Sequence, residues 1–277
     1  MVMNNTVAII MSVYHKEKIT FLRQAVDSML HQTYDNIVIY LGVDGPVGDE
    51  LKECITEYEK QNDTINVFWF EKNRGLAYVL NDLLDICFKN GIKFIARMDT
   101  DDISLLDRIN KQVLYLESNE DIDVVGGAIN EIDEFGNDLN KKVIFPESSK
   151  ACLKYFAKRN PFCHPSVMFR RSFFDKAGCL YPTEYIRNED TALWLEGFKH
   201  GIQGANLTDV ILNFRVTNTM FSQRRNGFSF AKNQLHLRKR IIKEMNFGFW
   251  SRIYAYLIFF LMIMPPRVIK IAYKVLG

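Results

Sequence analysis

The sequence lacks several features that would assign it to a familiar class of protein. It has five cysteines, an odd number with no C-x-x-C spacing, which argues against a disulfide framework. It has neither G-x-x-x-x-G-K-[ST] nor G-x-G-x-x-G, so neither glycine-rich phosphate loop is available to bind a nucleotide. No N-terminal segment has the basic and then apolar form of a signal peptide. These absences favour a reduced, cytoplasmic protein with structural thiols.

A strong net charge is also lacking. The 277 residues include 35 Lys and Arg against 33 Asp and Glu, a net charge of +2, and this balance gives no sign of a nucleic-acid partner. Hydrophobic residues make up 48% of the chain and charged residues 25%, which is typical of a globular protein with a substantial core. Basic residues gather late in the chain. We expect one large domain with a smaller C-terminal appendage.

Short apolar runs alternate with amphipathic segments over the first hundred residues. The runs predict four buried strands, at 7–12, 37–43, 65–70 and 93–98. With helices between them, such strands form βαβ units and a parallel sheet that is covered on both faces. Ligands bind beyond the carboxyl ends of the strands in these sheets. The expected ligand site therefore lies at 13–17, 44–49, 71–75 and 99–102.

The alternation loosens after residue 103. Helices are expected over 105–118, 149–159 and 189–201, the last capped by Asn188, and a hairpin over 122–145. The predicted fold class is α/β, with a parallel nucleotide-binding half and a mixed second half in one domain, followed by a basic helical extension. The predicted boundaries are 1–103, 104–220 and 221–277.

Three aspartates, Asp99, Asp101 and Asp102, follow the fourth apolar run. In an extended chain, Asp99 and Asp101 would point to one side and Asp102 to the other. Two carboxylates at the carboxyl end of a strand suit Mn²⁺ or Mg²⁺, which would offset their mutual repulsion. We expect Asp99 and Asp101 to bind metal, and Asp102 to hold the turn or contact Arg108. A solvated turn is the alternative.

Five segments in this order resemble the family 2 inverting glycosyltransferases of the GT-A fold, especially bacterial enzymes of O-antigen and capsule assembly. They are VAIIMSVYHKE, AVDSMLHQTYDNIVIYLGVDGP, NRGLAYVLND, IARMDTDDI and NEDTALW, within residues 6–217. The resemblance implies a Rossmann-like donor half and a mixed-sheet acceptor half. It also implies metal-dependent transfer of a hexose, glucose or galactose, from a UDP-sugar. The implied acceptor is GlcNAc or GalNAc on polyprenyl diphosphate, and the product has a β linkage.

The resemblance also assigns residues to the donor. Tyr14 corresponds to the residue that stacks on the base, although His15 stands where the family usually has Asn. Asp44 corresponds to the aspartate that accepts a hydrogen bond from uracil. Arg74 and Gly75 correspond to a loop near the nucleotide, where arginine can meet phosphate and glycine lets the backbone approach.

The same resemblance implies roles in catalysis. Asp101 is the direct metal ligand, and Asp99 contacts ribose or a metal-bound water. Asp190 is the candidate base that removes the proton of the acceptor hydroxyl, and Glu189 orients the acceptor. His164 lies where this subgroup lines its acceptor side. The alternatives are structural, because acidic residues favour the first turn of a helix and a lone histidine is more often structural.

Basic residues around 214–225 resemble a segment that closes over the diphosphate, so Arg215, Arg224 or Arg225 is expected to contact it. Arg170 and Arg171 are candidates for an acceptor phosphate. A solvated charged face is the alternative for each of these arginines.

Residues 253–264 form an uncharged run of twelve, too short for the roughly 20 residues of a membrane-spanning helix. Aromatic and basic residues flank it, which suits a segment in the interface of an anionic inner leaflet. These residues are Trp250, Arg252, Tyr254, Tyr256, Arg267, Lys270 and Lys274. A peripheral protein at the inner face of the cell membrane is expected. A buried helix or an oligomer contact is the alternative.

Two other functions compete. A metal-dependent phosphohydrolase would use Asp99 to attack phosphorus and Asp101 as acid and base, although such a motif usually follows the first strand. A non-catalytic sugar-nucleotide-binding scaffold would keep the donor site without turnover.

Overall fold

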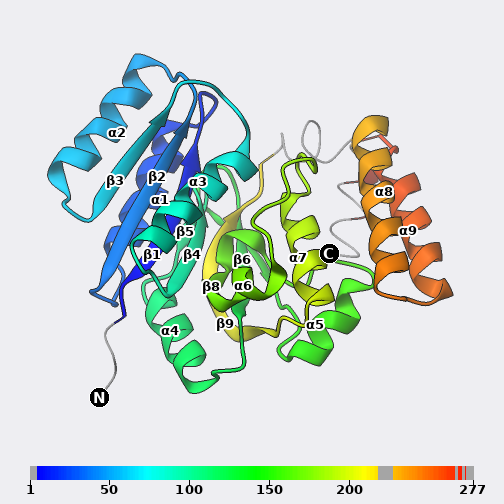
Figure 1. The fold of residues 1–277 in the computed structure, drawn as a ribbon. Helices are drawn as coiled ribbons and strands as arrows, with labels where there is room; N and C mark the ends of the chain where they lie inside the picture. The colour runs from blue at the N-terminus through cyan, green and yellow to red at the C-terminus, as the bar shows by residue number, and fades with distance from the viewer. Residues whose placement is uncertain (1–4, 218–226, 266–267, 270–271, 273–277) are drawn as a thin grey trace.

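One mixed sheet runs through both halves of the chain (Figure 1). The computed structural model describes residues 5–217, 227–265, 268–269 and 272. Within them the strand order is β3-β2-β1-β4-β8-β6-β9-β5, and β7 pairs with β6. The strands are β1 Val7–Val13, β2 Ile37–Asp44, β3 Ile65–Phe70, β4 Phe94–Asp99, β5 Ile103–Ser104, β6 Val124–Ile132, β7 Asp138–Val143, β8 Met168–Arg170 and β9 Gly204–Arg215.

Helices cover both faces of this sheet. They are α1 Ile19–Leu30, α2 Asp49–Gln61, α3 Leu76–Lys89, α4 Arg108–Ser118, α5 Ser149–Phe156, α6 Ser172–Ala177, α7 Glu189–Lys199, α8 Phe228–Glu244 and α9 Phe249–Met262. The side chains of α1, α2 and α4 pack in one core, and those of α3, α5, α6 and α7 pack in the other. No helix in the described residues is both long and apolar enough to cross a bilayer.

The predicted parallel half is confirmed. β1 pairs in parallel with β2 and with β4, and β2 pairs in parallel with β3. β1 is apolar at every position except Ser12 because its side chains are buried on both faces of the sheet. In the register, Ser12 lies opposite Asp99 and Val13 lies opposite Val43. The chain therefore leaves these strands at neighbouring points on one edge of the sheet.

The second half contains the predicted hairpin and three strands that the sequence did not predict. β6 and β7 are antiparallel, and the turn between them is held by Asp133, whose carboxylate accepts the N–H groups of Phe135 and Asn137. β5 and β8 are too short to show a period. β9 runs parallel to β6, but two exposed residues in its middle, Thr208 and Asp209, coincide with shifts in register and interrupt the apolar pattern.

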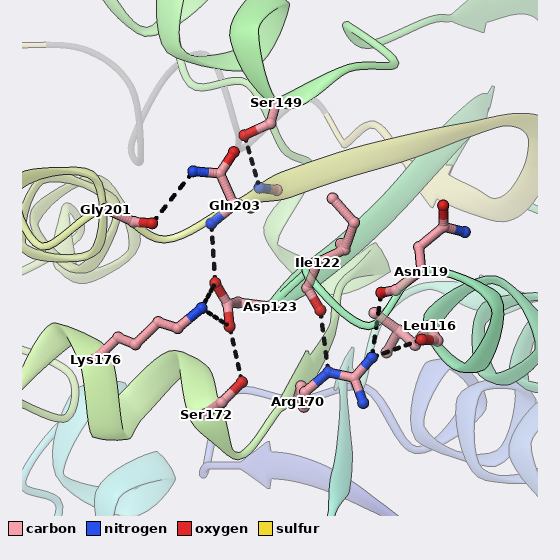
Figure 2. A network of polar contacts seen from close by, with 11 residues as sticks. Leu116, Asn119, Ile122, Asp123, Ser149, Arg170, Ser172, Lys176, Gly201 and Gln203 are labelled. Atoms are coloured by element: carbon pink, nitrogen blue, oxygen red, sulfur yellow. Dashed lines mark hydrogen bonds and ion pairs between the residues drawn. The ribbon is translucent and has the colours of Figure 1, made fainter.

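A buried carboxylate joins three elements of the second half (Figure 2). Asp123 lies just before β6. Both of its carboxylate oxygens accept hydrogen bonds from Lys176 Nζ at 2.8 Å, and Oδ1 also accepts one from Ser172 Oγ at 2.7 Å. Its carboxylate also accepts the N–H of Gln203 at 2.9 Å. Asp123 thus fixes α6 and the start of β9 to β6.

Asp123→Ala is expected to lower the free energy of unfolding by about 1.5–3 kcal/mol, because several hydrogen bonds to a buried charge are lost together. Urea denaturation followed by circular dichroism measures this. Asp121→Ala, two residues away and exposed, is the matched control. Equal effects of the two substitutions would contradict the assigned role of Asp123.

Candidate active site

The loops after β1 and β4 contact each other at the carboxyl edge of the sheet. Thr100 Oγ1 donates a hydrogen bond to Glu17 Oε2 at 2.6 Å. Tyr14, in the same loop as Glu17, is 42% exposed, with its ring edge against the His15 ring at 5.4 Å between centroids. The Tyr14 ring is therefore accessible at the expected ligand edge, and its stacking on a base stays a prediction.

Asp44 is buried at the end of β2 and organises the loop that follows β3. Its two carboxylate oxygens accept the backbone N–H groups of Arg74, at 2.8 Å, and Gly75, at 2.9 Å. Gly75 directly precedes α3 and has a φ of +97°, a backbone conformation that residues other than glycine rarely adopt. The Arg74 guanidinium pairs with Asp82 and lies 4.9 Å from the Phe70 ring centroid. The uracil contact of Asp44 and the phosphate contact of Arg74 stay predictions.

The three aspartates at the end of β4 and in the turn after it lie together. The predicted position of Asp102 was wrong. One carboxylate oxygen from each of Asp99, Asp101 and Asp102 lies within 4.8 Å of those of the other two. Asp102 was expected on the opposite face, but the chain turns at 100–102, so the alternation of an extended strand ends at Asp99. Asp102 is buried, and burial, Asp101 and Asp99 raise its pKa well above the usual range.

Arg215, at the end of β9, fixes the aspartate turn. Its backbone N–H donates to Asp102 Oδ1 at 2.7 Å, and its Nε donates to the main-chain oxygen of Asp101 at 2.7 Å. The remaining guanidinium nitrogens donate to Asp133 O at 3.1 Å and Gln24 Oε1 at 2.6 Å. Arg215 is buried. The guanidinium is thus bonded inside the protein, and its contact with a diphosphate stays a prediction. Asp102 therefore holds the turn, as predicted.

Arg97 is a site residue that the sequence interpretation missed. It is fully buried in β4 and forms an ion pair with Asp99 Oδ1 through Nη2, while Nε and Nη1 have no hydrogen-bond partner in the described residues. The available signal was a charge in a strand expected to be covered on both faces. Arg108, predicted as the alternative contact of Asp102, instead donates to Arg97 O at 2.7 Å and Gln112 Oε1 at 3.0 Å.

The acidic pair at the start of α7 lies within electrostatic reach of this cluster. Burial and the neighbouring Asp190 raise the pKa of Glu189 to about 7. The Arg97 charge lowers this pKa and the Asp99 charge raises it, each to a smaller extent. Asp190 accepts hydrogen bonds from Thr191 N at 2.6 Å and Asn160 Nδ2 at 3.1 Å, which orient its carboxylate. Asn188 precedes the helix as predicted, but its side chain does not cap it.

His164 lies beside the same group of charges. Its Nε2 is 2.8 Å from Tyr181 Oη, and Tyr181 is buried. Burial, with a smaller effect of the Arg97 charge, lowers the pKa of His164 well below its usual value and so favours the neutral imidazole. Its contact with an acceptor stays a prediction.

The other arginine predictions have separate outcomes. Arg170 pairs with Phe94 at the amino end of β4, and its guanidinium donates to Leu116 O and Ile122 O. Arg171 contacts Phe88 O. Both therefore lie at the edge of the sheet opposite the site, and their predicted contact with an acceptor phosphate was wrong. Arg224 and Arg225 lie outside the described residues.

Glu189→Gln is expected to raise the melting temperature at pH 8 and to change it little near pH 4.5. A carboxyl whose pKa rises from 4.5 to about 7 on folding binds its proton more tightly in the folded state. The stabilisation of the folded state by this bound proton is fully present below about pH 4.5 and is lost as the pH rises through about 7. Glutamine keeps the neutral form at every pH. Differential scanning calorimetry measures the shift, and Glu184→Gln, exposed in the preceding loop, is the control. A larger gain at low pH would contradict this charge assignment.

The aspartate cluster fits a divalent cation. It combines three carboxylates with a buried oxygen, Asp102 Oδ2, that has no hydrogen-bond partner among the described residues. Hard cations such as Mn²⁺ and Mg²⁺ prefer oxygen ligands of this kind. Asp99, Asp101 and Asp102 are the residues that would hold it.

Comparison with known sequences finds a matching family and several relatives. A family model described as "Glycosyl transferase family 2" matches residues 8–178. The chain is 34% identical to the Erwinia amylovora "Amylovoran biosynthesis glycosyltransferase AmsE", over 96% of this chain and 97% of that protein. It is 30% identical to the Escherichia coli "UDP-Gal:alpha-D-GlcNAc-diphosphoundecaprenol beta-1,3-galactosyltransferase", over 82% of this chain and 80% of that protein.

Solved structures show the same fold at low identity. S. aureus TarS 1-349 in complex with UDP-GlcNAc matches with a TM-score of 0.65 and 14% identity, over 92% of this chain and 70% of that chain. The chain spans 43% of a longer TarS chain. Mannosyltransferase PcManGT from Pyrobaculum calidifontis, in complex with GDP-Man and Mn²⁺, matches with a TM-score of 0.61 and 13% identity, over 98% of this chain and 79% of that chain. These likenesses confirm the GT-A fold predicted from the sequence.

Proposed function

The chain belongs to glycosyl transferase family 2, and from that premise we propose that it transfers a hexose, glucose or galactose, from a UDP-sugar to a saccharide acceptor. The proposed acceptor is GlcNAc or GalNAc on polyprenyl diphosphate, in O-antigen or capsule synthesis. The E. coli relative named for UDP-Gal and GlcNAc-diphosphoundecaprenol supports both substrates, and the TarS complex with UDP-GlcNAc supports the donor class.

One observation carries the proposal. Asp99, one of three clustered carboxylates at the end of β4, lies within electrostatic reach of Glu189, which belongs to a second acidic pair at the start of α7. In the proposed site the first group holds the donor diphosphate and the second meets the acceptor. Residues 1–103 form the donor half in this scheme, and residues 104–220 form the acceptor half.

The proposed reaction inverts the configuration at the sugar carbon. The acceptor hydroxyl attacks from the face opposite the departing UDP, so an α-linked donor gives a β linkage. Asp190 removes the hydroxyl proton as the new bond forms, and its bonds from Thr191 and Asn160 hold the carboxylate in one orientation. Glu189, with a pKa of about 7, orients the acceptor by a hydrogen bond.

A divalent cation, Mn²⁺ or Mg²⁺, completes the proposed donor site. Asp101 and Asp99 are the predicted ligands, and Asp102 joins them because its carboxylate lies in the same cluster. When bound, the cation stabilises the charge that develops on the departing diphosphate. Arg97 holds Asp99 from within the sheet, and Arg215 holds the turn.

We further propose that the enzyme works at the cytoplasmic face of the cell membrane as a peripheral protein. A lipid-linked acceptor resides there, and the C-terminal segment has the composition of an interfacial helix.

A panel of UDP-sugars with Mn²⁺ and a synthetic GlcNAc-diphospholipid tests the proposal, with products read by mass spectrometry and linkage-specific glycosidases. The expected result is one β-linked hexose product that requires the metal. Release of phosphate from p-nitrophenyl phosphate with no transfer would instead support the phosphohydrolase. UDP binding with no turnover on any donor would support a non-catalytic scaffold.

A further inference from the structure

The outer face of α9 is apolar and exposed. Its large side chains include Trp250, 75% exposed, and Leu257, 61% exposed. The exposed set is Phe249, Trp250, Tyr256, Leu257 and Phe260 in α9, with Ile263 and Met264 directly after it. With the half-buried Ile253, these side chains recur every three or four residues and so line one side of the helix. The buried side carries the small residues Ser251 and Ala255. A contiguous exposed face of this kind marks an interaction surface.

A cationic stripe on α8 borders this apolar face. Lys232, Lys239 and Lys243 are exposed and spaced seven and four residues apart, so they share one side of α8. The stripe meets the apolar face where Lys239 Nζ lies 4.9 Å from the ring centroid of Tyr256. α8 and α9 lie side by side at the end of the molecule farthest from α2 (Figure 1).

The charge of this region has one sign. α8 and α9 together contain six Lys and Arg and a single acidic residue, Glu244. The Glu244 carboxylate is paired with Lys199 at 2.7 Å and with Arg240 at 2.6 Å. The surface that α8 and α9 present therefore suits a partner that is both anionic and apolar.

We propose that α9 lies in the interface of an anionic lipid bilayer, with its apolar face toward the acyl chains and the α8 stripe among the headgroups. A helix of 14 residues is about 21 Å long, shorter than the hydrocarbon core of about 30 Å, so it lies along the surface. A protein partner would match the apolar face, but the adjoining stripe of cations favours a charged lipid surface. This proposal names the lipid surface for the membrane location proposed above. That the acceptor is lipid-linked rests on the proposed function.

The α8 helix is joined to α7, the helix that carries the acidic pair. Gln234 of α8 donates a hydrogen bond to Asn188, which immediately precedes Glu189. Arg240 of α8 pairs with Glu196 of α7 at 2.7 Å. A bilayer that holds α9 therefore also sets the orientation of the amino end of α7, where a lipid-linked acceptor has to arrive.

Cosedimentation of the full-length protein with sucrose-loaded vesicles tests the proposal. Vesicles of phosphatidylcholine alone are compared with vesicles in which a third of the lipid is phosphatidylglycerol, at low and high salt. Binding is expected to the anionic vesicles and to weaken as salt is added, because exposed charges are screened. The fluorescence of Trp250 is expected to shift to the blue on binding in a Trp69→Phe background.

Two sets of variants separate the contributions of the surface. Lys232→Glu, Lys239→Glu and Lys243→Glu together are expected to weaken binding about 100-fold, from the contribution of each basic residue near an anionic surface. The control combines Lys52→Glu, Lys60→Glu and Lys89→Glu. It replaces three other exposed lysines and changes the net charge by the same amount. Leu257→Glu with Phe260→Glu is expected to abolish binding. The control is Leu106→Glu with Phe135→Glu, because Leu106 and Phe135 are exposed and lie far from α8 and α9 in the sequence.

Equal binding to both kinds of vesicle, or equal loss in a variant set and its control, would overturn the proposal. So would a dimer in sedimentation that Leu257→Glu with Phe260→Glu converts to a monomer, because the face would then contact a second copy. Vesicle binding needs neither donor nor turnover. Binding without any transfer activity would therefore count against the proposed function alone, and transfer without binding would count against the docking surface alone.

Discussion

Asp190→Asn is expected to lower kcat by about 10²–10⁴-fold and to leave the affinity for UDP unchanged. The loss is the usual contribution of a positioned general base. Asparagine keeps an oxygen that can accept the Thr191 N–H, so the start of α7 is preserved. Single-turnover transfer assays measure the chemical step, and calorimetric titration with UDP and Mn²⁺ measures the binding.

Glu189→Gln is the matched control for this experiment, because it removes the adjacent carboxyl from the same turn of α7. It is expected to raise KM for the acceptor more than it lowers kcat. If Glu189→Gln abolished the chemical step and Asp190→Asn retained it, the base would be Glu189. Full activity in both variants would remove the acidic pair from the mechanism.

Asp101→Ala is expected to lower kcat/KM about 10³-fold, since stabilisation of the departing diphosphate by a metal amounts to several kcal/mol. The affinity for Mn²⁺ is expected to fall in parallel, and titration of the free ion by electron paramagnetic resonance measures it without turnover. The Arg215 contact to this residue uses the main-chain oxygen, which alanine retains. The fold of the turn is therefore expected to survive.

Asp107→Asn is the control for Asp101→Ala, because it removes a carboxylate that pairs with Lys111 outside the cluster. Its Mn²⁺ affinity and transfer rate are expected to match those of the parent. Transfer that is intact in Asp101→Ala, or equally metal-dependent in both variants, would exclude Asp101 as a ligand.

The sequence predicted the parallel half well because the burial of β1, β2 and β4 on both faces leaves a plain signal. β1 to β4 consist mainly of apolar residues, with Arg97 and a few small or polar residues as the exceptions. The helices between these strands repeat their apolar residues with the period of a helix. β9 gave no such signal. Its exposed middle around Thr208 and its irregular register with β6 depend on a partner strand about eighty residues earlier.

The site was predicted less completely for two physical reasons. The alternation rule placed Asp102 on the wrong side because it applies to an extended chain, and the chain turns after Asp99. The partners of Arg97 and Arg215 are set by tertiary packing that no local pattern records. Buried guanidinium groups bonded to main-chain oxygens look the same in a sequence as solvated ones. No local pattern therefore indicated that Arg215 fixes the aspartate turn.

The bond from Arg215 to Asp102 joins residues 113 positions apart. Contacts of such large sequence separation carry a high entropic cost of loop closure, so they form late in folding. During synthesis, the parallel strands β1 to β4 can emerge and pair well before β9 is made. The aspartate turn acquires its final shape only once β9 has docked, so an unfinished chain is expected to be a poor nucleotide binder even with every donor-side residue already in place.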